Sequence, residues 1–242
     1  MSALLLFLAG PMQSWGIQSR FTERDTGLEP SKSGVIGLLC AALGRRRAEP
    51  VDDLATLRMG VRVDQEGVMR RDYHTAGGGG LGIARADGSH SRDAVLSNRY
   101  YLADAQFLVG LEGSDDSLLA ELHASLRSPV WQLSLGRKAF LPAVPPYLPN
   151  GLSNGLPLSE TLTRYPWPVT NDLCPLRQQP DGLPRPGELR LVLELQTRET
   201  PQPTDIVEER MDQPFGASFH TRRFYSRRTV TRYIPIPTPQ EA

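Results

Sequence analysis

The sequence predicts an α+β fold with the element order β-α-β-β-α-β. Two observations support it. Four segments have the alternating or continuous apolar pattern of strands, and two others have apolar residues at helical spacing. These segments follow one another in that order within residues 1–142, an order typical of a ferredoxin-like (RRM-like) domain. The expected strands are Ala3–Ala9, Leu57–Asp64, Tyr100–Leu111 and Val130–Leu135, and the expected helices are Lys32–Leu43 and Ser114–Leu126.

Each element has its own justification. Ala3–Ala9 is apolar throughout, which predicts a strand buried on both faces. It is too short for a membrane span, which needs about 20 apolar residues, and no basic residue precedes it as in a signal peptide. In the first helix, Val35 and Leu39 belong to an apolar face at helical spacing. In the second, Ser114 is the expected N-cap and acids fill the first turn.

Two irregular regions interrupt this pattern. Residues Glu66–Arg99 form a long, glycine-rich insertion between the second and third strands, which we expect to be an arm. Pro142–Pro186 contains 11 of the 21 prolines and is expected to be irregular. Glu188–Gln196 and Arg223–Ile234 then predict two strands of a small C-terminal β unit. The expected division is 1–142, 143–186 and 187–242.

Composition limits the function classes. The 27 basic and 27 acidic residues balance, so no global charge indicates a nucleic-acid partner. Between Pro214 and Gln240, however, there are five arginines and no acid. Cys40 and Cys174 are the only cysteines, which predicts a reducing cytoplasm and neither a disulfide framework nor a metal cluster. We predict no cofactor and no metal.

The stretch EPSKSGVIGLLCAALGRRR raises the question of a phosphate site. It is not a Walker A loop, because Lys32 stands where the second glycine is required. One interpretation is a buried helix capped by Ser31. The other is a phosphate site made by helix N–H groups and Lys32, because a lysine at a helix N-terminus is favourable only if an anion neutralises it. The sequence leaves both open.

Three further stretches carry suggestive chemistry. Gly136 precedes Arg137 and Lys138 at the end of an expected strand, where phosphate contact is plausible but surface charge is common. Tyr73 and His74 could stack on bases, or His74 could be a general base, although a histidine on a loop is more often solvated. FHTRRFYSRRTVTRY interleaves aromatics with arginines, which is typical of single-stranded nucleic-acid binding and also of protected edge strands.

Five stretches in order resemble the CasD family, the CRISPR-associated subunits that cap one end of the type I-E Cascade complex. They are FLAGPMQSWG, PSKSGVIGLLCAALG, RDYHTA, YYLADAQFLVGL and LGRKAFLP. The resemblance is strong over residues 1–142, weaker through the proline-rich region and faint in the final arginine-rich strand.

The resemblance implies a ferredoxin-like domain with an arm between strands two and three. It also implies binding of the 5′ handle of the CRISPR RNA, without catalysis. The implied partners are a backbone subunit (CasC-type) and a large subunit (CasA-type), with target DNA reached indirectly through the complex. The alternative is a metal-independent endoribonuclease that processes repeat RNA, for which Tyr73, His74, His220 and Lys138 are the available candidates. Chemistry placed on the family motifs gives the expected RNA-binding residues: Ser14, Trp15, Lys32, Ser33, Gly34, Arg45, Arg46, Tyr73, His74, Arg99, Arg137 and Lys138.

Overall fold

A seven-stranded sheet forms the centre of the molecule. The computed structural model describes residues 1–17, 22–77, 82–84, 88–167, 187–196, 199–216, 221 and 223–237. They form an α+β structure in which the sheet has the order β10-β1-β9-β4-β11-β13-β12, with every neighbouring pair antiparallel. Its strands are β1 (Ser2–Ala9), β4 (Arg58–Gln65), β9 (Gln106–Gly113), β10 (Tyr147–Asn154), β11 (Glu188–Glu194), β12 (Ile206–Phe215) and β13 (Arg223–Pro235).

Four helices within the described residues pack against this sheet: α1 (Lys32–Leu43), α2 (Asp52–Ala55), α3 (Asp116–Arg127) and α4 (Leu158–Arg164). The predicted bounds of α1 are confirmed, because Ser31 caps its first turn and Gly44 ends it with a left-handed φ of 74°. The cap of α3 is Asp115 instead of Ser114, since its Oδ1 accepts the N–H groups of Ser117 and Leu118, each at 3.0 Å. None of these helices combines the length and apolarity that crossing a membrane requires.

The expected strand Tyr100–Leu111 is two strands, β8 (Val95–Ala103) and β9. The chain bends between them at Asp104, which has a φ of 57°. The alternation of apolar and polar residues continues through the bend, so the sequence pattern gave no sign of the break between the two strands. The tyrosines therefore belong to the arm, while the apolar residues after Ala105 belong to the large sheet.

The prediction of a strand at Val130–Leu135 is wrong. The N–H groups of Val130 and Trp131 donate to the carbonyls of Ala42 (2.9 Å) and Ala41 (3.1 Å), so this segment satisfies the C-terminal end of α1 instead of pairing in a sheet. The strand that follows α3 is β10, inside the region expected to be irregular. Pro149 is tolerated there because β10 is an edge strand. The short helix α4 also lies in this region, whereas residues 168–186 lie outside the described part.

The C-terminal strands continue the large sheet. β11 pairs with β4, so that Val192 lies opposite Val61, and β13 and β12 follow at the edge. The expected C-terminal β unit therefore shares the sheet of the N-terminal strands. β12 was not predicted, because its sequence IVEERMDQPF has no clear alternation.

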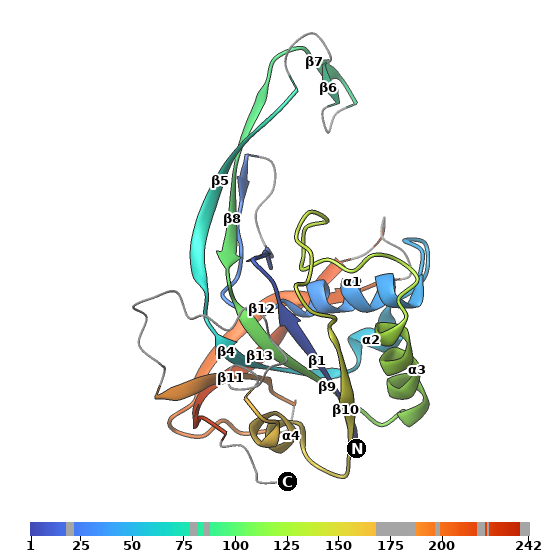
Figure 1. The fold of residues 1–242 in the computed structure, drawn as a ribbon, viewed down its shortest axis with the longest axis vertical. Coiled ribbons are helices and arrows are strands. Elements are labelled where there is room, and N and C mark those ends of the chain that lie inside the picture. The colour runs from blue at the N-terminus through green and yellow to red at the C-terminus, as the bar shows by residue number, and fades with distance from the viewer. Residues whose placement is uncertain are drawn as a thin grey trace.

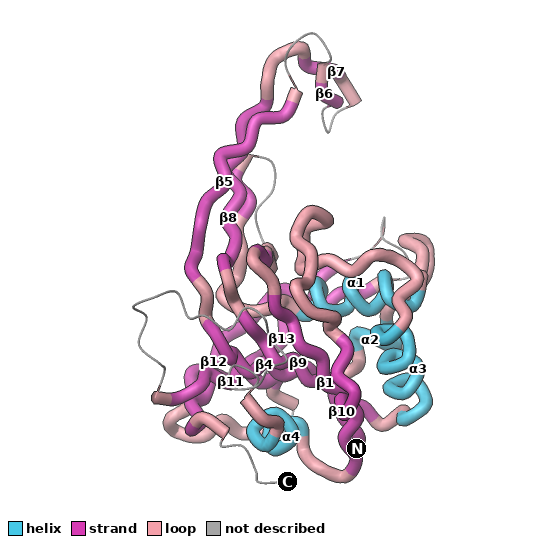
Figure 2. The backbone as a smooth tube through the Cα atoms, in the orientation of Figure 1, coloured by secondary structure: helices cyan, strands magenta, loops and turns pink. Residues whose placement is uncertain are grey.

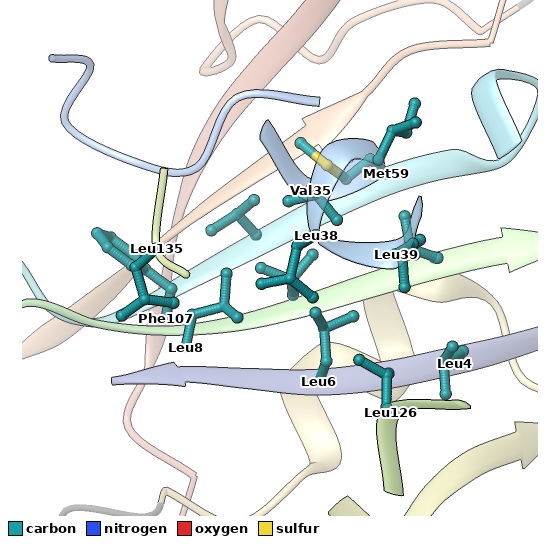
Figure 3. Packing of buried hydrophobic residues seen from close by; sticks show 14 of the residues in the cluster. Leu4, Leu6, Leu8, Val35, Leu38, Leu39, Met59, Phe107, Leu126 and Leu135 are labelled. Carbon is teal, nitrogen blue, oxygen red and sulfur yellow. The ribbon is translucent and has the colours of Figure 1, made fainter. Parts of the chain in front are cut away.

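The core lies on both faces of the sheet, as predicted for β1. Leu4, Leu6 and Leu8 face the cluster that contains α1 and α3, and Figure 3 shows them with side chains of α1. Ala3 and Leu5 face a second cluster that contains α4. Burial of alternate residues on opposite faces fixes the register of this strand.

The helix α4 rests on two glycines. Gly60 of β4 and Gly110 of β9 lie directly opposite each other. A Cβ atom would lie 2.7 Å from Leu162 Cδ1 at Gly60 and 2.6 Å from Leu158 Cδ1 at Gly110. The helix therefore packs on the sheet backbone and covers the face opposite to α1 and α3.

The insertion forms a long two-stranded arm. β5 (Val68–Ala76) pairs with β8 along its whole length, and the small strands β6 (Ile83–Ala84) and β7 (His90–Ser91) lie near the far end. Figures 1 and 2 show the arm projecting away from the body. Near the body, β2 (Met12–Gln13) and β3 (Glu23–Arg24) pair with the other edge of β8. The part of the insertion that the structure describes is therefore largely a β ribbon.

Replacing Gly110 with valine should lift α4 from the sheet. We expect a loss of about 1–3 kcal/mol in the free energy of unfolding, the usual cost of overpacking. Urea unfolding followed by circular dichroism measures it. As a control, Gly37→Ala places a methyl group in open space on α1 and should stabilise the protein by roughly 0.5–1 kcal/mol. Equal stability of Gly110→Val and the unmodified protein would contradict the described packing.

Candidate nucleic-acid interface

A tight turn at Gly136 fixes the positions of Arg137 and Lys138. Gly136 has a φ of +88°, and a Cβ atom there would lie 1.8 Å from the carbonyl oxygen of Ser14. The N–H of Ser14 donates to the carbonyl of Leu135 (3.1 Å), and its hydroxyl donates to a backbone carbonyl of β8 (3.2 Å). The backbone that approaches this glycine is thus the chain's own. These contacts hold the turn at the root of the arm.

Three arginines from separate segments gather where the arm joins the body. Arg24 of β3 lies opposite Arg99 of β8, and Arg99 lies opposite Asp72 of β5. Because residues directly opposite in a sheet share a face, this row points to one side of the arm. The Nη2 of Arg137 donates to the carbonyl of Arg24 (3.3 Å), and its guanidinium lies 5.4 Å from the ring centroid of Phe140. We call Arg24, Arg99 and Arg137 the arm-root cluster.

Arg137 lies in an unfavourable electrostatic environment. Burial lowers the pKa of the Arg137 guanidinium, and repulsion from Arg99 and Arg24 lowers it further. Asp72 and Asp25 oppose this shift, but their attraction is smaller than the repulsion. Arg137 remains charged at neutral pH, since arginine titrates far above it. A bound anion beside Arg137 would therefore relieve the repulsion that this residue experiences.

Lys138, Tyr73 and His74 differ in their positions relative to the arm-root cluster. Lys138 follows Arg137 and is exposed. Tyr73 is 63% exposed on β5, and His74 Nδ1 lies 3.5 Å from an oxygen of Asp72. Since neighbouring residues of a strand point to opposite faces, His74 shares the face of Asp72 and Arg99, whereas Tyr73 lies on the other face. The structure brings His74 to the cluster and separates Tyr73 from it.

Lys32 is buried and bound to carboxylates of the same chain. Its side chain is 1% exposed, and Nζ lies 3.0 Å from both carboxylate oxygens of Glu194. Its backbone N–H donates to Asp212 Oδ2 (2.7 Å). Burial lowers the pKa of the Lys32 ammonium, and the two carboxylates compensate only in part. The anion that neutralises Lys32 is therefore Glu194, and the geometry gives no support to the expected contact of this lysine with RNA.

Arg227 completes this buried network. Its Nε and Nη2 donate to Asp212 at 2.6 and 2.9 Å, and its Nη1 lies 3.6 Å from Glu194. Lys32, Glu194, Asp212 and Arg227 thus form a buried group of two cations and two anions, which we call the α1 network. It joins the start of α1 to β11, β12 and β13.

The other candidates around α1 are mainly structural. Trp15 is 1% exposed, and a Cβ atom on Gly34 would lie 2.8 Å from its ring. Its indole N–H donates to Gln13 Oε1 (3.2 Å), so the geometry gives no support to stacking of this ring on a base. Ser33 is half-buried beside the cap residue Ser31. Trp15 and Gly34 pack against each other and position the segment after β1, while RNA contact by half-buried Ser33 stays a prediction.

Arg45 and Arg46 lie at the far end of α1. Arg45 donates to both carboxylate oxygens of Asp53, at 2.7 and 2.5 Å. Arg46 is exposed, and its backbone N–H donates to Glu49 (2.6 Å). Neither residue belongs to the arm-root cluster.

Sequence reasoning missed Arg24 and Asp72. Arg24 lies in RFTERDTG, which has no helical or strand periodicity. Its position beside Arg99 is revealed only by the parallel pairing of β3 with β8. The charge pair in RDYHTA was a usable signal for Asp72, since it places a carboxylate two residues from His74.

Comparison with known proteins now identifies the class. The family model described as "CRISPR-associated protein (Cas_Cas5)" matches residues 3–234. The chain therefore belongs to the Cas5 family of CRISPR-associated proteins. It is 35% identical over 157 residues to the CRISPR system Cascade subunit CasD of Escherichia coli (strain K12), a match that spans 57% of this chain and 66% of that protein.

Two solved structures are similar over nearly the whole chain. One, described as the crystal structure of a Cas protein, has a TM-score of 0.72 and 41% identity, and the match covers 98% of this chain and 100% of that one. The other comes from a CRISPR RNA-guided surveillance complex and has a TM-score of 0.71 with 33% identity, covering 98% of this chain and 91% of that one.

Removing the Asp212 carboxylate should destabilise the protein through the α1 network. Asp212→Ala leaves Arg227 and Lys32 short of one counter-charge, so we expect a loss of about 3–5 kcal/mol in the free energy of unfolding. Urea unfolding measures it. The exposed pair Arg45–Asp53 is the control, and Asp53→Ala should cost less than about 1 kcal/mol.

The pH dependence of the free energy of unfolding tests the ionisation of Asp212 in the α1 network. Burial alone would raise the pKa of Asp212, but Arg227 and the Lys32 N–H outweigh it and hold the pKa below its ordinary value. A depressed pKa contributes stability above the unfolded-state pKa of about 3.9, and that stability is lost as pH falls through the folded-state value. The wild type should therefore lose more stability than Asp212→Asn below about pH 4. Parallel stability curves would show that Asp212 is not held ionised.

Proposed function

We propose that this chain is a non-catalytic subunit of a Cascade-type surveillance complex and that its arm-root cluster binds the 5′ handle of the CRISPR RNA. Membership of the Cas5 family and similarity to a Cascade subunit and to a chain of an RNA-guided complex support the assembly. The assignment of RNA binding to this site rests on the electrostatic environment of its arginines. Arg24 of β3 and Arg99 of β8 lie opposite each other beside Arg137 of the 136–138 turn and repel it more strongly than Asp72 and Asp25 attract it, and an RNA phosphate beside Arg137 would relieve this repulsion.

The fold supports a ferredoxin-like arrangement. The order β10-β1-β9-β4, with α1 between β1 and β4 and α3 between β9 and β10, is the arrangement expected for such a domain. RNA-recognition motifs stack bases on the exposed face of their sheet. Here α4 packs on that face over Gly60 and Gly110. RNA binding at the root of the arm is consistent with this obstruction.

The roles within the site follow from chemistry. Arg137, Arg99 and Arg24 contact phosphates, and exposed Lys138 adds a further cation beside them. Tyr73, on the opposite face of the arm, is available for stacking on a splayed base or for a neighbouring protein subunit. Contacts with a CasC-type backbone subunit and a CasA-type large subunit, and indirect recognition of target DNA, are the remaining parts of the proposal. Exposed Arg46, away from the cluster, is a candidate for one of these subunit contacts.

Salt dependence of RNA binding tests the cluster. The double variant Arg99→Ala/Arg137→Ala should weaken binding of an RNA with the handle sequence. It should also flatten the plot of log affinity against log salt by about 0.7 for each phosphate that the variant no longer neutralises. Fluorescence anisotropy across a salt series gives both quantities.

Two controls make this test specific. Arg46→Ala removes an exposed arginine outside the cluster and should leave the slope unchanged. Lys32→Met removes a buried amine and should lower the free energy of unfolding. The protein that remains folded should show an unchanged salt slope. An unchanged slope in Arg99→Ala/Arg137→Ala, with the fold intact, would reject the proposed site.

The alternative function, metal-independent cleavage of repeat RNA, lacks a rigid acid–base pair among the described candidates. Such cleavage needs a base for the 2′-hydroxyl, an acid for the leaving oxygen and a cation, all positioned within about 0.5 Å. Tyr73 and His74 point to opposite faces of β5, and His74 is about two-fifths exposed beside Asp72. His220 lies outside the described residues. The geometry therefore favours binding.

Incubation of the purified protein with repeat RNA in EDTA separates these functions. We expect intact RNA after prolonged incubation, and His74→Ala should alter binding modestly without any change in the RNA. Denaturing gel electrophoresis with end-labelled RNA detects cleavage at single-nucleotide resolution. Site-specific cleavage that disappears in His74→Ala would support the endoribonuclease.

A further inference from the structure

The β12–β13 hairpin contains the arginine-rich stretch that the proposed RNA site does not use. Its sequence pattern is typical of single-stranded nucleic-acid binding. β13 and β12 are the last strands in the order of the large sheet, and β12 is the edge opposite to β10.

Most of its arginines are occupied within the protein. Arg227 pairs with Asp212 in the α1 network, and Arg232 pairs with Asp205 (2.7 Å). Arg210 of β12 contacts Glu29 and Glu208. Arg228 lies directly opposite Glu209 in the strand register. Because nucleic-acid affinity depends on cations that neutralise phosphates, these pairs remove the main support for a nucleic-acid surface on the described hairpin.

Apolar side chains are exposed on the same hairpin. Phe215 is 45% exposed and Tyr225 is 53% exposed, and their ring centroids lie 4.7 Å apart. The other large apolar side chains exposed on these strands are Ile206, Val207, Met211, Phe224 and Tyr233. Aliphatic side chains gain from burial against other apolar groups and do not stack on bases. Ile206 and Val207, like Phe224 and Tyr225, are strand neighbours that point to opposite faces, so the exposed apolar groups lie on both sides of the hairpin. Phe215 and Tyr225 share one face, and an exposed aromatic pair of this kind is typical of a protein-binding surface.

No further strand of the described residues pairs with the outer edge of the hairpin, although α1 and α2 contact β12 and the N–H of Gly216 donates to Asp52 Oδ1 (3.4 Å). β12 is the terminal strand of the seven-stranded order, so within the described residues its backbone pairs only with β13. A free edge binds an extended chain by adding a strand, with side-chain pockets providing specificity. Arg223 is exposed and lies directly opposite Phe215, which places a cation beside the aromatic pair. Charge complementarity therefore favours a carboxylate next to an apolar side chain in the bound segment.

We propose that the edge of β12 and the Phe215–Tyr225 pair bind an extended segment of another protein subunit, with apolar residues and an acidic residue that meets Arg223. This surface lies on different strands from the arm-root cluster and does not depend on RNA binding there.

Internal competition during assembly tests the surface. Wild-type chain and the variant Phe215→Ser/Tyr225→Ser are co-expressed with the other subunits of the complex, and mass spectrometry measures their ratio in the purified complex. Loss of two central anchors should deplete the variant about tenfold or more. Leu152→Ser, on the exposed part of β10 at the other edge of the sheet, should be incorporated as well as wild type. Thermal unfolding and handle-RNA binding of the isolated variant should match wild type, which separates this result from failure of the RNA site.

Photo-cross-linking identifies the occupant. Benzoylphenylalanine replaces Met211, which is exposed on the edge strand, and the complex is irradiated after purification. We expect a cross-link to a different protein subunit of the complex. A cross-link to RNA, a cross-link to a second copy of this chain, no cross-link, or equal incorporation of the serine variant would each overturn the proposal.

Discussion

The α1 network is the interaction on which the rest of the structure depends. It neutralises Lys32 at the start of α1 and joins that helix to three C-terminal strands. The fixed helix start brings Gly34 against Trp15, whose backbone N–H donates to Thr26 Oγ1 (2.9 Å) just beyond β3. The adjacent residue Ser14 holds the Gly136 turn. A buried ionic group of this kind is a weak source of net stability, because desolvation offsets its attraction, but it tolerates few alternative arrangements. Its effect here is positional, since it aligns the segments that meet at the arm root.

The chain uses its balanced charge in two distinct ways. Many arginines form ion pairs and hydrogen bonds within the protein. Arg62, for example, is fully buried, pairs with Asp64 and donates to the carbonyls of Leu162 and Tyr165 at the end of α4. Arg137 in the arm-root cluster does the opposite, because Arg99 and Arg24 repel it more strongly than Asp72 and Asp25 attract it. A neutral total charge therefore conceals a local site that favours an anion. This arrangement agrees with the proposed binding of RNA at one place and of protein subunits elsewhere.

The features that could be predicted from the sequence are those that local interactions determine. The bounds of α1 followed from its cap, its apolar face and Gly44, all within a few residues of one another. The role of Lys32 could not be predicted, since Glu194 and Asp212 are 162 and 180 residues away in the chain. The break between β8 and β9 was hidden by continuous alternation, and β10 was hidden by prolines that only an edge strand tolerates. Arg137 was predicted from the motif LGRKAFLP and Arg99 from its place at the end of the expected arm, whereas Arg24 joins them only through strand pairing. The same long-range pairing occupies Arg227 and Arg232, which the composition alone had marked for nucleic acid.

The most direct test of the central claim is to map where RNA touches this chain in the intact complex. Ultraviolet cross-linking of the assembled particle, followed by mass spectrometry of the cross-linked peptides, locates the contact without any substitution. The account predicts that handle nucleotides are attached to peptides of β3, β8 and the 136–138 turn. Handle cross-links confined to α4 and the sheet face beneath it, or to the β12–β13 hairpin, would contradict it.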